Sequence, residues 1–203
     1  HCRQGVTQPS DVRRIDQVFI NNGNNTYTQD VSNWTGLRDG AQGWATASGD
    51  IDNDGDNDLF VMNYDVNSKL MINNGAGVFT NAIVGSGIVN TTTFFGQNCT
   101  YHDFDNDGFL DLLITGSGDF LYRGNGNGTF TNMVNPFPDS SGQPINAYGV
   151  GDLNVDGKLD VYASYCEMWT SSGVSDKLWM NATSNSNHYI MFDLVGGASN
   201  GMS

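Results

Sequence analysis

Short apolar runs alternate with polar and glycine-rich segments along the whole chain. The clearest of these runs lie at 59–62, 112–114 and 161–162. No stretch repeats its apolar positions with the 3.6-residue period of a helix over several turns. Runs of this length that are bounded by Gly, Asn and Asp are typical of β-strands, so the pattern predicts a protein that is nearly all β.

A second pattern recurs around Asn/Gly turns. Each copy has an apolar segment, a turn and a new segment that opens on an aromatic residue, which is Tyr27, Phe79 or Phe130 in the three clearest copies. The copies lie at 18–27, 70–79 and 121–130, with a looser one at 178–181. Two strand-like segments around such a turn indicate a β-hairpin.

Each of the three apolar runs directly follows a nine-residue acidic segment. These segments begin at Asp50, Asp103 and Asp152, about fifty residues apart, and each follows a hairpin copy at a distance of roughly thirty residues. A period near fifty residues indicates an array of equivalent supersecondary units. Two patterns in constant phase support one repeat better than either pattern does alone.

The acidic segments have the spacing of calcium loops. Five carboxylates within residues 50–58 would repel one another strongly unless a cation lay among them. Side chains at positions 1, 3, 5 and 9 can face a common centre, and Gly at position 6 permits the turn that brings the carbonyl of position 7 inward. Oxygen ligands without thiolate or imidazole favour calcium over zinc or copper.

The predicted ligands follow from these positions. The side-chain ligands are Asp50, Asp52, Asp54 and Asp58 in the first loop, Asp103, Asp105, Asp107 and Asp111 in the second, and Asp152, Asn154, Asp156 and Asp160 in the third; the carbonyl ligands are those of Asp56, Phe109 and Lys158. An EF-hand would need Glu at position 12, where this chain has Val61, Ile114 and Ala163. Each loop is therefore expected to end at position 9 and to lead into a strand. Because Asn154 replaces an acid, the third site is expected to bind more weakly.

With both motifs located, the chain resembles the VCBS/FG-GAP class of repeats found in integrin-like β-propellers. The resemblance implies a four-stranded antiparallel blade for each repeat, with the calcium loop joining two strands near one rim. It divides the chain into a polar segment 1–16, a partial blade 17–43, repeats 44–95, 96–146 and 147–186, and a final segment 187–203. That final segment is similar to the opening of an ASPIC/UnbV module.

The predicted blades leave the array open at both ends. Three and a half blades cannot close a ring of the usual four to eight, and an open array exposes strand edges that recruit other strands. We therefore expect either missing blades in a longer chain or head-to-tail association of copies, in which strands such as 189–195 complete a neighbour. Head-to-tail contacts that do not close produce a filament.

Charge and composition narrow the setting. The formal net charge is −14, which argues against nucleic-acid backbones and anionic membranes as partners. Twelve of the 22 acidic residues lie in the three loops, so much of this charge is there to bind metal. No stretch approaches the roughly 20 apolar residues of a membrane span. The start at His1, without Met or an apolar leader, predicts a processed or partial chain.

An extracellular location agrees with the loops and with the sequons. Open calcium sites with a dissociation constant of ~0.1–1 mM suit extracellular calcium. Three cysteines, Cys2, Cys99 and Cys166, allow either one disulfide with a leftover thiol or buried free thiols. Six N-x-T sequons make this a candidate glycoprotein; their asparagines are Asn24, Asn33, Asn90, Asn98, Asn127 and Asn181.

The functional hypothesis is a secreted, calcium-binding structural or adhesive protein without catalysis. The chain contains no G-x-S-x-G, H-E-x-x-H or phosphate-loop signature, and its single Glu167 has no acidic partner outside the loops. Trp34 and Trp44 are expected in the core between blades, with a sugar-binding platform as the alternative. The other hypotheses are a glycan-binding module and a non-catalytic part of a polysaccharide-active enzyme.

Overall fold

The computed structural model describes residues 11, 13–89, 96–116, 118–134, 136–138, 143–165 and 173–189. Within these residues the regular elements are β-strands and none is a helix, which confirms the predicted all-β class. No helix in this part of the chain is therefore long and apolar enough to cross a membrane.

The strands form a hairpin followed by three antiparallel sheets. The hairpin contains β1 (Phe19–Asn21) and β2 (Tyr27–Gln29). The first sheet contains, in spatial order, β3 (Gly43–Gly49), β4 (Asp58–Asn63), β5 (Lys69–Asn73) and β6 (Phe79–Asn81). The second contains β7 (Gly96–His102), β8 (Asp111–Gly116), β9 (Phe120–Gly124) and β10 (Phe130–Met133). The third contains β11 (Ala147–Gly151), β12 (Asp160–Ser164) and β13 (Lys177–Trp179).

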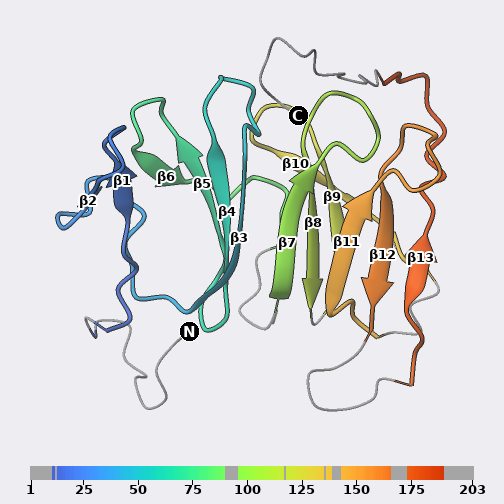
Figure 1. Ribbon diagram of the computed structural model, residues 1–203, viewed down its shortest axis with the longest axis horizontal. Coiled ribbons are helices and arrows are strands. Elements are labelled where there is room, and N and C mark those ends of the chain that lie inside the picture. Colours follow the sequence, from blue (N-terminus) through green and yellow to red (C-terminus); the bar gives the residue numbers. More distant parts are fainter. Residues whose placement is uncertain are drawn as a thin grey trace, which may run out of the picture.

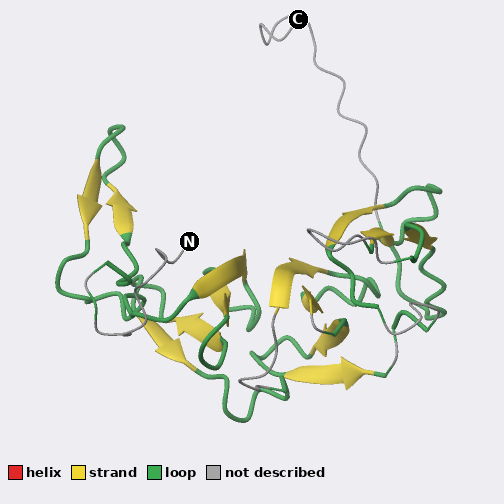
Figure 2. Ribbon diagram, turned by 90° about the horizontal axis from the view of Figure 1, so that it is seen from below, coloured by secondary structure: helices red, strands yellow, loops and turns green. Residues whose placement is uncertain are grey.

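The hairpins and the four-stranded sheets confirm the predicted blade pattern. Tyr27, Phe79 and Phe130 open the second strand of their hairpins, as the sequence predicts. The third sheet has three strands among the described residues. The sheets stand side by side in sequence order (Figure 1) and form an open arc rather than a closed ring when viewed from below (Figure 2).

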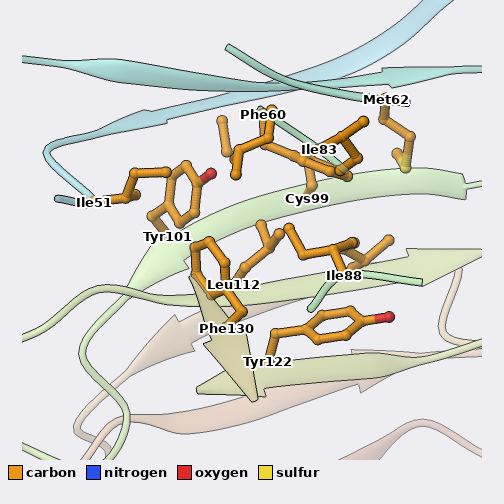
Figure 3. Close-up of a cluster of buried hydrophobic side chains, with 13 residues drawn as sticks. Ile51, Phe60, Met62, Ile83, Ile88, Cys99, Tyr101, Leu112, Tyr122 and Phe130 are labelled. Carbon is orange, nitrogen blue, oxygen red and sulfur yellow. The ribbon is translucent and has the colours of Figure 1, made fainter. Parts of the chain in front are cut away.

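Two clusters of buried apolar side chains join neighbouring sheets. The first lies between the first and second sheets and includes Phe60, Met62, Tyr101 and Tyr122 (Figure 3). The second lies between the second and third sheets. Burial of one such side chain contributes about 1.5–3 kcal/mol, so the spaces between the sheets are the main source of stability.

Strand β8 shows why its sequence is apolar without alternation. All six of its residues are buried, because successive side chains point to opposite faces and both faces are covered. Leu112 and Ile114 lie in the first cluster, whereas Leu113 lies in the second. In β8 the continuous apolar run therefore belongs to a strand that is covered by a neighbouring sheet on each face.

The segments that connect the sheets also hydrogen-bond to the following sheet. The N–H of Phe79 donates to the carbonyl of Thr35 at 2.7 Å, and the N–H of Phe130 donates to the carbonyl of Ser86 at 2.7 Å. The next residue is glycine in both segments. Gly87 has a φ of +86°, and a Cβ there would overlap the carbonyl oxygen of Phe130.

We expect Gly87→Ala to destabilise the protein much more than Gly85→Ala. Both glycines have a positive φ, +86° and +87°, so Ala is strained at either position. A Cβ at Gly85 meets nothing within 4 Å, so only Gly87→Ala adds the steric overlap. The overlap should add about 1–3 kcal/mol to the loss, measured by denaturant unfolding. Equal losses would show that the close approach to Phe130 contributes nothing.

The structure corrects the expectation for two tryptophans. Trp34 and Trp44 do not lie in the core between blades, and both are more than two-fifths exposed. Trp44 stacks on Tyr64 with 5.7 Å between ring centroids. The expectation was wrong because aromatic residues near glycine-rich linkers can lie at the surface as readily as between sheets, and local sequence does not distinguish the two.

Candidate functional site

Each acidic loop joins the first two strands of a sheet. The strands meet at the pairs Gly49 with Asp58, His102 with Asp111, and Gly151 with Asp160, so position 9 of each loop is also the first residue of a strand. This placement is the one that the resemblance implied. The three loops therefore occupy equivalent places in the three sheets.

The first carboxylate of each loop shapes the turn. Its two oxygens accept the backbone N–H groups of positions 5 and 6, at 3.1 and 3.1 Å for Asp50, 3.1 and 2.9 Å for Asp103, and 3.1 and 2.8 Å for Asp152. The glycine at position 6 has a positive φ in every loop, between +82° and +96°. The curled backbone thus depends on one acid and one glycine; the sequence predicted the role of the glycine, but it predicted the acid only as a metal ligand.

The last carboxylate of each loop connects the loop to the hairpin. Asp58, Asp111 and Asp160 are buried, and each accepts two backbone N–H groups from opposite sides. The donors are Ile51 and Asn73 for Asp58, Phe104 and Gly124 for Asp111, and Leu153 and Asn181 for Asp160, at 2.8–3.1 Å. The sequence identified these acids only as metal ligands. Their contact with the hairpin was missed, because it depends on strand pairing.

Two triads of carboxylates lie close enough together to hold a metal ion. In each triad the ligand oxygens lie within 4.8 Å of one another. The triads are Asp50, Asp52 and Asp58, and Asp103, Asp105 and Asp111. They contain positions 1, 3 and 9, so the structure brings together three of the four predicted side-chain positions in two loops.

Burial makes these acids hard to ionise without a cation. It raises the pKa of Asp111 to about 7, although the N–H groups of Gly124 and Phe104 favour the charged form. Burial also raises the pKa of Asp52, and the nearby charge of Asp54 raises it further. A divalent ion would reverse both effects, because it supplies the positive charge that the site lacks.

Unpaired oxygens test whether a cation fits the first loop. Asp52 Oδ1 is buried and has no hydrogen-bond partner among the described residues. A buried carboxylate oxygen without a donor is costly, and a bound cation is a partner that would remove this cost. Asp56 Oδ1 is also buried and unpaired, on a side chain that approaches the hairpin turn at Gly75. The donor set of this loop therefore fits calcium.

In the second and third loops, protein groups already interact with some of the carboxylates that a cation would bind. Arg123 pairs with Asp105 at 2.9 Å and with Asp107 at 2.7 Å. The equivalent hairpin positions are Ile72 and Met180, which carry no charge. In the third loop, the Asn154 amide donates to Asp156 at 3.0 Å. The first loop has the most negative charge and the fewest internal partners.

Position 4 of each loop adopts a left-handed conformation that the sequence analysis did not anticipate. The φ values are +60° at Asn53, +56° at Asn106 and +61° at Val155. The Asn53 amide donates to Gly126 at 3.3 Å and the Asn106 amide donates to Gly157 at 2.9 Å, so both reach the next sheet's turns or loops. Asparagine tolerates this conformation well, whereas a β-branched residue is strained there.

We expect Val155→Asn to stabilise the third loop. Val155 is exposed, so the substitution loses little apolar burial while it relieves the strain of a β-branched residue at positive φ. The gain should be about 1 kcal/mol in the free energy of unfolding, measured with calcium present. The reciprocal control, Asn106→Val, should lose at least as much. A loss of stability in Val155→Asn would contradict this account.

The sequons and cysteines differ in their surroundings. Asn24, Asn33 and Asn127 are exposed, whereas the Asn181 amide donates to Phe104 at 2.7 Å and to Leu159 at 3.2 Å. Asn98 is half-buried in β7. Asn90, Cys2 and Cys166 lie outside the described residues. Cys99 is a buried free thiol, and burial raises its pKa to about 12.

The class of protein is now defined as an open array of β-sheets with an acidic metal-type loop between the first two strands of each. A family model described as the FG-GAP-like repeat matches residues 50–114 and 103–163, which together exceed half of the 203-residue chain. The chain belongs to the FG-GAP-like repeat family. No curated protein matches it.

The comparison supports only part of the predicted resemblance. It confirms the FG-GAP repeats and gives no support to an ASPIC/UnbV segment at 187–203. Most of that segment, from residue 190 onward, lies outside the described residues. The alternating residues 187–196 resembled the opening of the module, but a single short alternating stretch is too common in β-proteins to identify a family.

Proposed function

We propose that this protein is a secreted, calcium-stabilised scaffold with a structural or adhesive role and without catalysis. The observation that carries the proposal is the buried, unpaired Asp52 Oδ1 inside the triad of Asp50, Asp52 and Asp58. FG-GAP repeats often bind calcium and are typical of extracellular proteins, which supports both the ion and the location.

The loops would hold calcium through their acidic positions. Positions 1, 3 and 9 supply the triads in the first two loops, and Asp152, Asn154 and Asp160 supply the equivalent side chains in the third. Positions 5 and 7 remain proposed ligands, the latter through the carbonyls of Asp56, Phe109 and Lys158. Bound calcium would neutralise the carboxylates and so fix the strand that begins at position 9.

Calcium titration of the metal-free protein tests this proposal. Isothermal calorimetry should detect up to three ions, with dissociation constants of about 0.1–1 mM. Asp50→Asn should remove one binding event and leave the others. Magnesium, which requires tighter octahedral geometry, is the control and should bind more weakly. The absence of calcium-dependent heat at millimolar calcium would reject the proposal.

We expect Arg123→Met to increase the calcium affinity of the second loop. The guanidinium occupies oxygens of Asp105 and Asp107 and places a positive charge beside the site. Two half-exposed pairs are worth about 1 kcal/mol together, which corresponds to roughly fivefold in affinity. The reciprocal substitution Ile72→Arg should weaken the first loop. Unchanged calorimetric affinities in both variants would show that Arg123 does not oppose calcium.

A glycan-binding role is the second candidate, favoured by the exposed stack of Trp44 and Tyr64. The rings lie 5.7 Å apart with 28° between their planes, and both are about two-fifths exposed. Exposed aromatic faces are suited to the apolar face of a sugar ring. A glycan array with the intact protein and with Trp44→Ala tests this role. Signals that survive Trp44→Ala would remove the stack as the binding surface.

A further inference from the structure

The outer face of the third sheet exposes apolar residues at positions whose equivalents in the first and second sheets pack against the next sheet. Three positions in each repeat define this face. They are loop position 2, the strand residue two places after loop position 9, and the hairpin residue that pairs with that strand residue. In the first sheet these are Ile51, Phe60 and Leu70, which are all buried in the first cluster. The second cluster buries the second sheet's Phe104 and Leu113 and packs against Leu121.

In the third sheet the same three positions are open. They are occupied by Leu153, Tyr162 and Leu178, which are 57%, 49% and 47% exposed. A Cβ at the neighbouring Gly149 would meet nothing within 4 Å. We name these three residues the forward face. Because β12 pairs with β13 in the same register as β4 with β5 and β8 with β9, the forward face repeats the geometry of the two occupied interfaces.

The opposite end of the array carries the matching side of that interface. The residues that face the preceding sheet include Tyr122 in β9, buried in the first cluster, and Trp179 in β13, which packs against the second cluster. Both residues lie two positions before the asparagine or glycine that begins the hairpin turn. Phe19 in β1 holds the same position in the first hairpin. Phe19 is 55% exposed, and Tyr27 of the same hairpin is also exposed. We name Phe19 and Tyr27 the rear face.

We propose that the forward face of one molecule binds the rear face of a second copy of this chain. The contact continues the packing that already joins the first, second and third sheets. The molecule that binds the forward face therefore needs aromatic residues at the hairpin position that faces the preceding sheet. The rear face supplies them. This inference rests on the proposed scaffold role and names its partner as a second copy.

The two faces differ, so the contact is heterologous. A heterologous contact leaves one forward and one rear face free after each addition, and it extends the array unless rotation closes it into a ring. The described sheets form an open arc whose two ends do not meet (Figure 2). The expected assemblies are therefore dimers and longer chains whose proportion rises with concentration.

Sedimentation velocity of the full chain in saturating calcium tests the proposal. The intact protein should show species above the 22.0 kDa monomer, and their fraction should increase with concentration. Tyr162→Lys with Leu178→Lys removes the forward face, and Phe19→Lys removes the rear face. Each variant alone should be monomeric. Val84→Lys changes an exposed residue outside both faces and should assemble like the intact protein.

Mixing the variants tests the direction of the contact. The forward-face variant keeps a rear face and the rear-face variant keeps a forward face, so an equimolar mixture should form dimers that grow no further. A monomeric intact protein at all concentrations overturns the proposal, as does a mixture that stays monomeric. Assembly of the rear-face variant alone overturns the head-to-tail arrangement. Melting curves of the same variants with and without calcium report the calcium proposal separately.

Discussion

Removal of calcium with EDTA is expected to lower the melting temperature by about 8–16 °C. A ligand at tenfold its dissociation constant stabilises the folded state by about 1.4 kcal/mol per site, so three loops at that saturation give about 4 kcal/mol. For a chain of this size, each kcal/mol moves the melting temperature by about 2–4 °C. The measurement is a thermal melt in excess EDTA against one in millimolar calcium.

Two controls separate calcium from general ionic effects. Adding calcium back beyond the chelator should restore the original melting temperature, whereas an equal ionic strength of sodium chloride should not. Superimposable melts in EDTA and calcium would exclude a stabilising ion in all three loops. A small shift in the melting temperature would indicate that calcium occupies only one loop. We expect this to be the first loop, which has five carboxylates and no nearby basic partner in the described structure.

Asp58→Ala is expected to cost about 2–6 kcal/mol whether or not calcium is present. Asp58 is fully buried, and its two oxygens accept the N–H groups of Ile51 at 3.1 Å and Asn73 at 2.8 Å. Alanine leaves both donors unpaired, and each costs about 1–3 kcal/mol. Denaturant unfolding in calcium and in EDTA measures the two losses. Asp58→Asn keeps one acceptor oxygen and should lose less.

Asp52→Asn is the matched control from the same loop. With calcium it should lower stability, because it removes a ligand charge. In EDTA it should raise stability slightly, because it removes a carboxylate whose pKa is raised by burial and by the charge of Asp54. A loss for Asp58→Ala that disappeared in EDTA would show that Asp58 acts only through the metal and not through the hairpin.

The sequence predicted the local features of this protein closely. Strands, hairpins and acidic loops each depend on residues close together in the chain, so the short apolar runs and the repeat of about fifty residues are visible without a structure. The curled loop is an example: Gly55 at position 6 was predicted to permit the turn, and it has a φ of +96°. The third loop was also recognisable as the least acidic.

Features that depend on contacts between segments far apart in the chain were missed or wrong. Trp34 and Trp44 were placed in the core, although both are exposed. The pairing of Arg123 with Asp105 and Asp107 was not anticipated, because the hairpin and the loop meet only when β8 pairs with β9. The hydrogen bond from the hairpin to the acid at position 9 was also missed. The only trace of it in the sequence is the constant spacing of the two motifs.

The amino-acid sequence by itself therefore determined the all-β class, the repeat, the family and the acidic loops, since each arises from short-range pattern and spacing. The tertiary structure alone decided which apolar residues are covered. Phe60, Leu113 and Tyr162 hold the same place in their repeats, yet the first two are buried and the third is exposed. The physical reason is that burial depends on the neighbouring sheet, and the third sheet has none beside its outer face in the described structure.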